Sequence, residues 1–241
     1  MSDIKIIATS NLFGGYANPI QVMKMADAFS SLGFNVDILL PGWRKKINSL
    51  ELGDRFGVKN EFKISFIPNI SIIKKFFIIS FALGSYFKSF KWDKKTIIIS
   101  RNERAANLLL QAGEKVMYEN HTFYYATENI TSKYRKRVKN LMKKKNIRMV
   151  TISKRLKELW VDYGIMPEKI FVAHDGVDPE DFKKIAGLEK KAIRKKLGLP
   201  LKKNLICYVG SLKEDRGIEF ILASATLFKE KDYLFLIIGG S

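Results

Sequence analysis

The 241-residue sequence is poor in cysteine and histidine, with one of the former and two of the latter. Its cysteine, Cys207, lies inside the apolar run LICYV, where we expect it to be buried. A single cysteine forms no internal disulfide, which indicates a reducing compartment. The histidines, His121 and His174, are far apart in the sequence and have no cysteine near them, which argues against a metal cluster. We therefore expect neither a metal ion nor a cofactor.

Long apolar runs are also missing. No segment reaches the roughly 18 uninterrupted apolar residues that a membrane-spanning helix needs. The first ten residues, MSDIKIIATS, lack the charged start, the apolar core and the cleavage site of a signal peptide. The sequence therefore predicts a cytoplasmic protein.

Acidic residues are scarce, since 43 Lys and Arg face 24 Asp and Glu, a net charge of +19. The excess is concentrated in the middle of the chain: basic residues outnumber acidic ones by 21 to 6 over residues 71–160, but only by 8 to 6 before and 14 to 12 after them. A field of this kind favours an anionic partner, which could be a nucleic acid, a membrane surface or a phosphorylated substrate.

Strand-like and helix-like patterns alternate along the chain. Residues 4–8 are an apolar run, residues 19–33 carry apolar side chains at helical spacing, and residues 34–42 read as a second strand. Such β-α-β units build parallel sheets. The sequence thus predicts an α/β fold, a Rossmann-like open parallel sheet with helices on both faces. We expect a first domain over residues 1–178, a connecting segment over 179–203 and the incomplete start of a second Rossmann-like unit over 204–241.

Four residues follow predicted strands, where ligands bind in open parallel sheets. Gly14 and Gly15 would let the backbone approach a phosphate or sugar, or would only shape a turn. Arg101 could receive an anion, or it could form a surface ion pair with Glu103. His121 could orient a substrate hydroxyl or act as a base, or it could only hydrogen-bond locally.

Two motifs resemble one known family. Residues 160–182, WVDYGIMPEKIFVAHDGVDPEDF, resemble the hinge segment of the GT-B-fold retaining glycosyltransferases of family four, with the hinge loop at Asp175, Gly176 and Val177. Residues 208–220, YVGSLKEDRGIEF, resemble the turn that opens the second domain of that family. There, glycine amides, a helix start and a cation bind the nucleotide diphosphate, a combination suited to anions.

The resemblance implies transfer of a sugar, with retention of configuration, from a nucleotide-sugar donor to a glycan or lipid-linked acceptor, without a metal. It implies His121 as the catalytic residue beside the donor sugar and Arg101 as a contact of the acceptor or another anion. The residues that it assigns to the donor diphosphate are Gly14, Gly15, Gly210, Ser211, Arg216 and Gly217.

The sequence departs from the family pattern in two ways. Ser211 stands where many members carry arginine, and Arg216 where they carry lysine. The paired glutamates that hold the donor sugar in the family do not follow the last residues, LIIGGS. We therefore expect the chain to be truncated and inactive alone, unless a complementing chain completes its second domain. An alternative is a non-catalytic half that binds acceptor or membrane and works with a separate donor-binding chain.

The basic middle of the chain has its own alternatives. Residues 72–92 combine aromatic side chains with lysines, and residues 132–148 form a strongly basic helix. The first segment could be a helix packed against the sheet, or both could contact an anionic membrane surface at the inner face of the cell membrane. A basic nucleic-acid-binding protein is a third function, but no nucleic-acid partner is expected because no motif that reads DNA or RNA is present.

Overall fold

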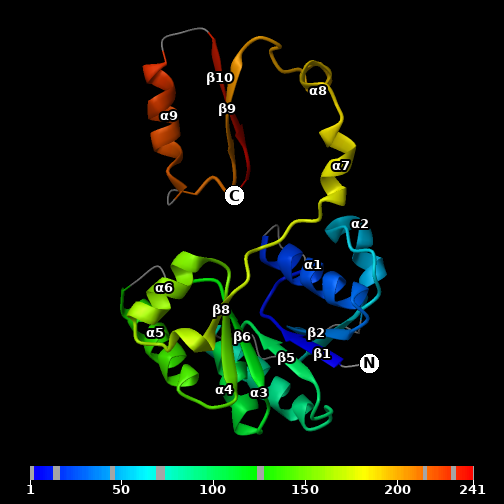
Figure 1. The fold of residues 1–241 in the computed structure, drawn as a ribbon, viewed down its shortest axis with the longest axis vertical. Coiled ribbons are helices and arrows are strands. Elements are labelled where there is room, and N and C mark those ends of the chain that lie inside the picture. Colours follow the sequence, from blue (N-terminus) through cyan, green and yellow to red (C-terminus); the bar gives the residue numbers. More distant parts are fainter. Residues whose placement is uncertain are drawn as a thin grey trace. The chain divides into compact units, whose positions relative to one another are not determined.

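The computed structural model describes residues 3–12, 17–43, 47–68, 74–123, 128–213, 216–228 and 232–240. The chain divides into two compact units, residues 1–176 and 177–241 (Figure 1). This division lies two residues before the boundary that we placed at Asp178 from the sequence, and it assigns the expected connecting segment to the second unit.

The first unit is built on an eight-stranded sheet in the order β3-β4-β2-β1-β5-β6-β7-β8. All neighbouring strands in it are parallel except β3 and β4, so the predicted open parallel sheet is confirmed. The strands are β1 (Asp3–Ile7), β2 (Asn35–Pro41), β3 (Ile47–Asn48), β4 (Lys63–Ile67), β5 (Ile97–Ser100), β6 (Val116–Asn120), β7 (Ile147–Thr151) and β8 (Ile170–Val172).

Helices cover both faces of this sheet, which explains why its strands are nearly continuous apolar runs. On one face, Ile4 and Ile6 of β1 belong to the same buried cluster as Val22 of α1. On the other face, Ile7 belongs to a cluster with Phe81 and Trp160. The helices of this unit are α1 (Ala17–Ser31), η1 (Ser49–Leu52), α2 (Gly53–Phe56), α3 (Lys74–Ser89), α4 (Glu103–Gln111), α5 (Glu128–Met142), α6 (Lys154–Asp162) and η2 (Pro167–Lys169).

Helix α3 packs very closely on the sheet at Gly84. A Cβ atom at this position would overlap with Cγ2 of Ile67 in β4, so only glycine allows this approach. Phe81 on the same helix is fully buried, whereas Phe76, Leu83 and Phe87 are exposed. Helix α3 therefore has one face packed on the sheet, as one of the two alternatives for this segment predicts, and another face in solvent.

The second unit contains a short parallel pair of strands. Its elements are α7 (Glu180–Ala186), α8 (Lys190–Lys196), β9 (Asn204–Val209), α9 (Ile218–Leu227) and β10 (Tyr233–Ile238). Strands β9 and β10 pair from Asn204–Tyr233 to Val209–Ile238. Cys207 in β9 is exposed, so the expectation that it would be buried is wrong. Val209, two residues further on and therefore on the same side of the strand, is exposed as well.

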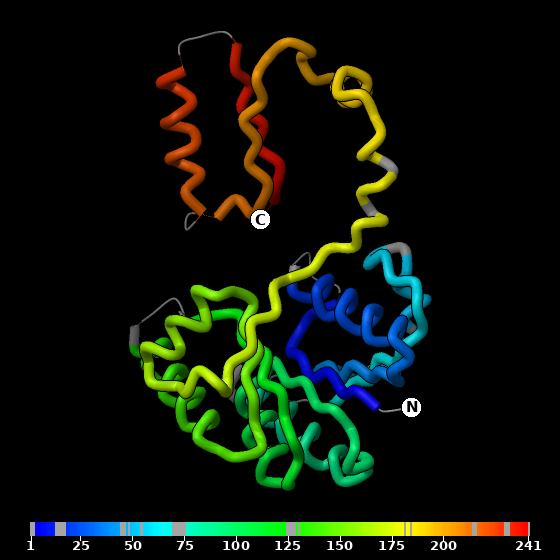
Figure 2. The backbone as a smooth tube through the Cα atoms, viewed as in Figure 1, coloured from blue at the N-terminus to red at the C-terminus, as the bar shows by residue number. Residues whose placement is uncertain are grey.

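The order of the strands places the loops that follow β1 and β5 next to each other in the interior of the sheet. The chain starts at β1 in the interior of the sheet, builds outward through β2 to β4, and then returns with β5 on the other side of β1 (Figure 2). The connections that follow β1 and β5 therefore diverge to opposite sides. A crevice at such a reversal is the usual ligand site of an open parallel sheet.

Candidate active site

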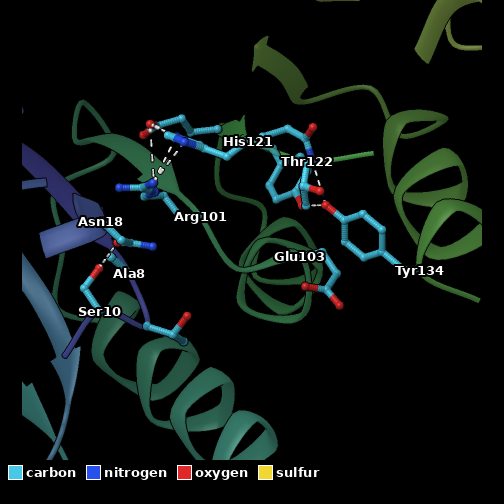
Figure 3. Close-up of a pocket in the computed structure, with 12 residues that line it drawn as sticks. Ala8, Ser10, Asn18, Arg101, Glu103, His121, Thr122 and Tyr134 are labelled. Atoms are coloured by element: carbon cyan, nitrogen blue, oxygen red, sulfur yellow. Dashed lines mark hydrogen bonds and ion pairs between the residues drawn. The ribbon is translucent and has the colours of Figure 1, made fainter. Parts of the chain in front are cut away.

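A pocket of about 100 Å³ lies at this reversal, at the carboxyl ends of β1, β5 and β6 (Figure 3). Its lining is mostly polar and comes from the ends of these strands, from the loops that follow them, and from side chains of α1, α4 and α5. The lining residues are Ala8, Thr9, Ser10, Asn18, Arg101, Glu103, Tyr118, Glu119, Asn120, His121, Thr122 and Tyr134.

Arg101 and His121, which follow β5 and β6, meet in this pocket. The Nη2 atom of Arg101 lies 3.0 Å from Nε2 and 3.2 Å from Nδ1 of His121. Glu119 completes the cluster, with Oε1 at 2.5 Å from Nε2 of His121 and 3.8 Å from Nε of Arg101. The side chains of Arg101 and Glu119 are only 7% and 6% exposed, whereas that of His121 is 25% exposed. His121 is therefore the accessible member of a three-residue cluster whose ion pair, between Arg101 and Glu119, is buried.

The contacts of His121 place a proton on Nε2. An ionised carboxylate only accepts hydrogen bonds, so the short contact with Glu119 requires Nε2 to donate. Nη2 of Arg101 lies at similar distances from both ring nitrogens. The ring is thus held from two sides, by a carboxylate and by a guanidinium.

The buried cluster retains unused hydrogen-bonding capacity. Among the described residues, Nη1 of Arg101 and Oε2 of Glu119 have no hydrogen-bond partner although both atoms are buried. Burial lowers the pKa of the Arg101 guanidinium, and the carboxylates of Glu119 and Asp175 counteract this effect. Because buried polar groups normally have partners, an unpaired donor and acceptor here suit a polar ligand.

A hydrogen-bonded wall fixes the end of β6 behind His121. The indole Nε1 of Trp160 donates to Oδ1 of Asn120 at 2.8 Å, and Nδ2 of Asn120 donates to the hydroxyl of Tyr134 at 2.6 Å. The hydroxyls of Tyr134 and Tyr118 are 3.0 Å apart. These four side chains are buried, so the backbone that carries His121 is attached to helices α5 and α6.

The start of α4 positions Arg101 in a similar way. Asn102 is the N-cap of this helix, and its Oδ1 accepts hydrogen bonds from the backbone amides of Arg104 at 3.0 Å and Ala105 at 2.9 Å. Glu103 pairs with Arg137 at 3.1 Å. The alternative that Arg101 forms a surface pair with Glu103 is therefore wrong, because the carboxylate paired with Arg101 is that of Glu119.

The hinge loop reaches the cluster through one side chain. Gln21 of α1 accepts from Nη2 of Arg101 at 3.0 Å and donates to Oδ1 of Asp175. Asp175 is thus linked to Arg101 through the side chain of Gln21. Gly176 and Val177, the other hinge residues, lie at the end of the first unit and the start of the second.

The remaining predicted residues lie elsewhere. Gly14 and Gly15 fall outside the described residues. Four belong to the second unit, at the turn between β9 and α9 (Gly210, Ser211, Arg216 and Gly217). In this turn Gly217 has a left-handed backbone with φ of +70° and is the N-cap of α9, so a glycine is required where the helix begins.

The sequence analysis missed Glu119 and Gln21. Glu119 lies in β6, two residues before His121, so the two side chains leave the strand on the same side; this spacing was the available signal. No signal in the sequence pointed to Gln21, which is 80 residues from Arg101.

Two kinds of feature are absent from the described parts of the chain. No group of three or more His, Cys, Asp or Glu side chains there could hold a metal ion. None of the helices there is long and apolar enough to cross a bilayer.

Part of the chain is similar in sequence to two curated proteins that are named as glycosyltransferases. The chain is 26% identical over 89 residues to WcaI of Escherichia coli, named as a glycosyl transferase of colanic acid biosynthesis, an alignment that covers 37% of the chain and 22% of that protein. It is 30% identical over 95 residues to an uncharacterized glycosyltransferase of Methanocaldococcus jannaschii, covering 39% of the chain and 24% of that protein. The chain thus matches about a quarter of the length of these curated relatives.

A solved structure shows the same fold. The model superimposes on Anabaena HepE, crystallised with UDP and glucose, with a TM-score of 0.67, 14% identity, and coverage of 100% of the chain and 62% of HepE. The fold is thus that of a GT-B Rossmann-like domain. The model of the family described as Glycosyltransferase Family 4 matches residues 20–181, more than half of the sequence. The chain therefore belongs to glycosyltransferase family 4.

Proposed function

We propose that this protein transfers a sugar from a nucleoside diphosphate sugar to an acceptor bound by the first unit, with retention of configuration and without a metal. The observation that carries the proposal is the cluster of Arg101, Glu119 and His121 at the strand reversal, with its unpaired guanidinium and carboxylate atoms. Membership of a glycosyltransferase family supplies the reaction class.

In this proposal the first unit holds the reacting sugar. Transfer of a glycosyl group develops oxocarbenium character and positive charge on the sugar ring. The carboxylate of Glu119 lies behind the His121 ring and sets a negative field there, while the ring itself offers the exposed surface of the cluster. Nη1 of Arg101 is a donor for an oxygen of the acceptor or of a phosphate.

The second unit holds the departing diphosphate. The turn between β9 and α9 combines Gly210, Ser211, Arg216 and Gly217 at the N-terminus of a ten-residue helix. Amides at a helix start and an arginine both stabilise negative charge that develops as the sugar leaves. Arg216 supplies the cation in this turn, where Ser211 supplies none.

We also propose that the first unit contacts an anionic membrane surface. Phe76, Leu83 and Phe87 of α3 and the adjacent Phe90 are exposed, in the part of the chain with the large basic excess. Exposed aromatic side chains enter the headgroup region of a bilayer, and lysines are attracted to anionic lipid. This placement favours a lipid-linked acceptor over a soluble glycan.

Nucleoside diphosphate binding tests the donor half of the proposal without requiring turnover. We expect UDP, GDP or ADP to bind in calorimetric titrations, and Arg216→Gln to weaken binding about tenfold or more, as loss of a charge-assisted hydrogen bond does. Arg155→Gln, on the exposed surface of α6, is the matched control and should bind like the wild type. Lack of binding by all three nucleotides, or equal binding by both variants, would contradict this role of the turn.

Transfer itself is tested with radiolabelled sugar donors and both soluble and lipid-linked acceptors. The anomeric configuration of the product, measured by NMR, distinguishes retention from inversion. The measurement is made with the chain alone and with a polypeptide that supplies the second-domain segment carrying paired glutamates in the family. Activity that appears only with the added polypeptide supports the complementing-chain hypothesis, and activity of the chain alone overturns it.

A further inference from the structure

A second cavity, of about 420 Å³, opens between α3, α4 and α5. Its wall is largely apolar, with Ile79, Ala82 and Leu83 from α3, Leu108 from α4 and Leu141 from α5. A concave site of this size, apolar with a few converging polar groups, has the character of a small-molecule binding site. We refer to it as the α3–α5 groove.

The polar groups of the groove carry an excess of positive charge. Arg104, Arg137 and Lys144 line it together with one carboxylate, Glu103. Arg137 is paired with Glu103 at 3.1 Å. Within the described residues, the side chains of Arg104 and Lys144 form no ion pair. Two cations thus stay available beside an apolar wall, a combination that is complementary to an anionic amphiphile.

The groove is continuous with the exposed face of α3. Phe76, Ile79, Leu83, Phe87 and Phe90 recur at spacings of three, four, four and three residues, which places them along one side of the helix and its end. Ile79 and Leu83 line the groove, and Phe76, Phe87 and Phe90 extend the same stripe on both sides of it at exposures of 54%, 63% and 64%. An apolar chain therefore has a contiguous path from the outer surface of α3 into the groove.

We propose that the α3–α5 groove binds the hydrocarbon chain of a single phosphate-bearing lipid, with the phosphate at Arg104 and Lys144. A soluble sugar phosphate would leave the apolar wall without a partner, and a nucleic acid would require an open polar surface instead of an apolar cavity. An anionic lipid uses both the wall and the two available cations.

The position of Glu103 relates this lipid to the reaction. Glu103 lines both the groove and the candidate active-site pocket, so the two cavities adjoin at this residue. On the basis of the proposed function, the bound lipid is the acceptor carrier: its chain lies in the groove, and its head group extends past Glu103 toward His121.

Binding of dodecyl phosphate, below its aggregation concentration, tests the groove without donor or turnover. We expect saturable one-to-one binding to the full chain by calorimetry, and Leu83→Gln to weaken it at least tenfold. The matched control is Leu32→Gln, an exposed leucine that lies neither in the groove nor on the apolar stripe of α3, and this variant should bind as the wild type. Leu83 is 41% exposed, so its substitution should leave the fold intact, which circular dichroism checks.

The charge requirement is tested with paired variants. The double variant Arg104→Gln with Lys144→Gln should weaken dodecyl phosphate binding at least tenfold. The control is Lys133→Gln with Lys136→Gln, which removes the same charge from exposed positions of α5 outside the groove. This control should bind dodecyl phosphate as the wild type does. The proposal is overturned if both pairs behave alike, if Leu32→Gln weakens binding as much as Leu83→Gln, or if dodecyl maltoside or inorganic phosphate binds as tightly.

The two proposals fail separately. Dodecyl phosphate binding without any glycosyl transfer, either by the chain alone or with the added polypeptide, would support the groove and contradict the proposed function. Transfer to a soluble glycan by a chain that does not bind dodecyl phosphate would support the function and overturn the groove.

Discussion

Arg101 and His121 are 20 residues apart in the sequence, yet the guanidinium Nη2 of one lies 3.0 Å from the imidazole Nε2 of the other. They meet because β5 and β6 are parallel neighbours, so the residues that follow both strands leave the sheet at the same edge. Glu119 lies between them in a buried position and turns the contact into a three-residue cluster.

Arg101→Gln should destabilise the fold and reduce transfer. Removing the cation leaves Glu119 buried without its partner, and breaking a buried pair in this way costs about 3–5 kcal/mol. Chemical denaturation measures this loss. The double variant Arg101→Gln with Glu119→Gln should recover most of the stability but not the activity. Full recovery of activity in the double variant would show that the charge of Arg101 has no catalytic role.

Arg101→Lys should make stability depend on pH on the alkaline side. Burial lowers the pKa of Arg101 because the charged form is desolvated, and the same environment should lower that of a lysine from its usual value of about 10.4. The unfolded state then binds the proton more tightly than the folded state, so the free energy of unfolding rises as pH increases toward 10. Denaturation between pH 7 and 10 measures it, and a wild-type slope would contradict the expected shift.

His121→Asn should lower kcat about 100-fold or more if the ring contacts the reacting sugar, as general acid–base and electrostatic residues do. His174→Asn is the matched control, since His174 is exposed and its Nδ1 lies 3.1 Å from the backbone carbonyl of Ile152, outside the Arg101 cluster. Nitrogen chemical shifts of labelled imidazole provide a second readout. They should show the proton of His121 on Nε2, and a proton on Nδ1 would refute the hydrogen-bond assignment.

Trp160→Phe should destabilise the wall behind His121 by about 1–3 kcal/mol, because Oδ1 of Asn120 would be buried without a donor. Trp92→Phe, at a half-buried position outside this network, should have a smaller effect. Thermal unfolding compares the two. A Trp160 variant as stable as the Trp92 variant would mean that the indole hydrogen bond contributes little.

Much of the fold could be predicted from the sequence because parallel strands are buried on both faces and therefore appear as short apolar runs, as at Ile97–Ser100. The boundary of the first unit could be placed near Asp178 from the alternation of strand and helix patterns, and the structure has it two residues earlier. The burial of Cys207 was predicted wrongly, since an apolar run alone does not tell whether a second layer covers a strand.

The candidate site was accessible to prediction only in part. Arg101 and His121 follow strands directly, and that position alone identifies a residue at the ligand-binding edge. Gln21 and Asp175 are 154 residues apart, and only the packing of α1 beside the hinge brings them together. The α3–α5 groove forms between three helices that are separated in the sequence, so no local sequence pattern could predict it.

The glycine at position 84 has a consequence for the surface as well as for the interior. Without a side chain there, α3 lies close against Ile67, while Leu83 and Phe87 of the same helix remain exposed. A single methyl group at position 84 would lift the helix and change the width of the space between α3 and its neighbours. Under the proposed lipid binding, Gly84→Ala should therefore change the selectivity for lipid chains, although Gly84 itself does not line the groove.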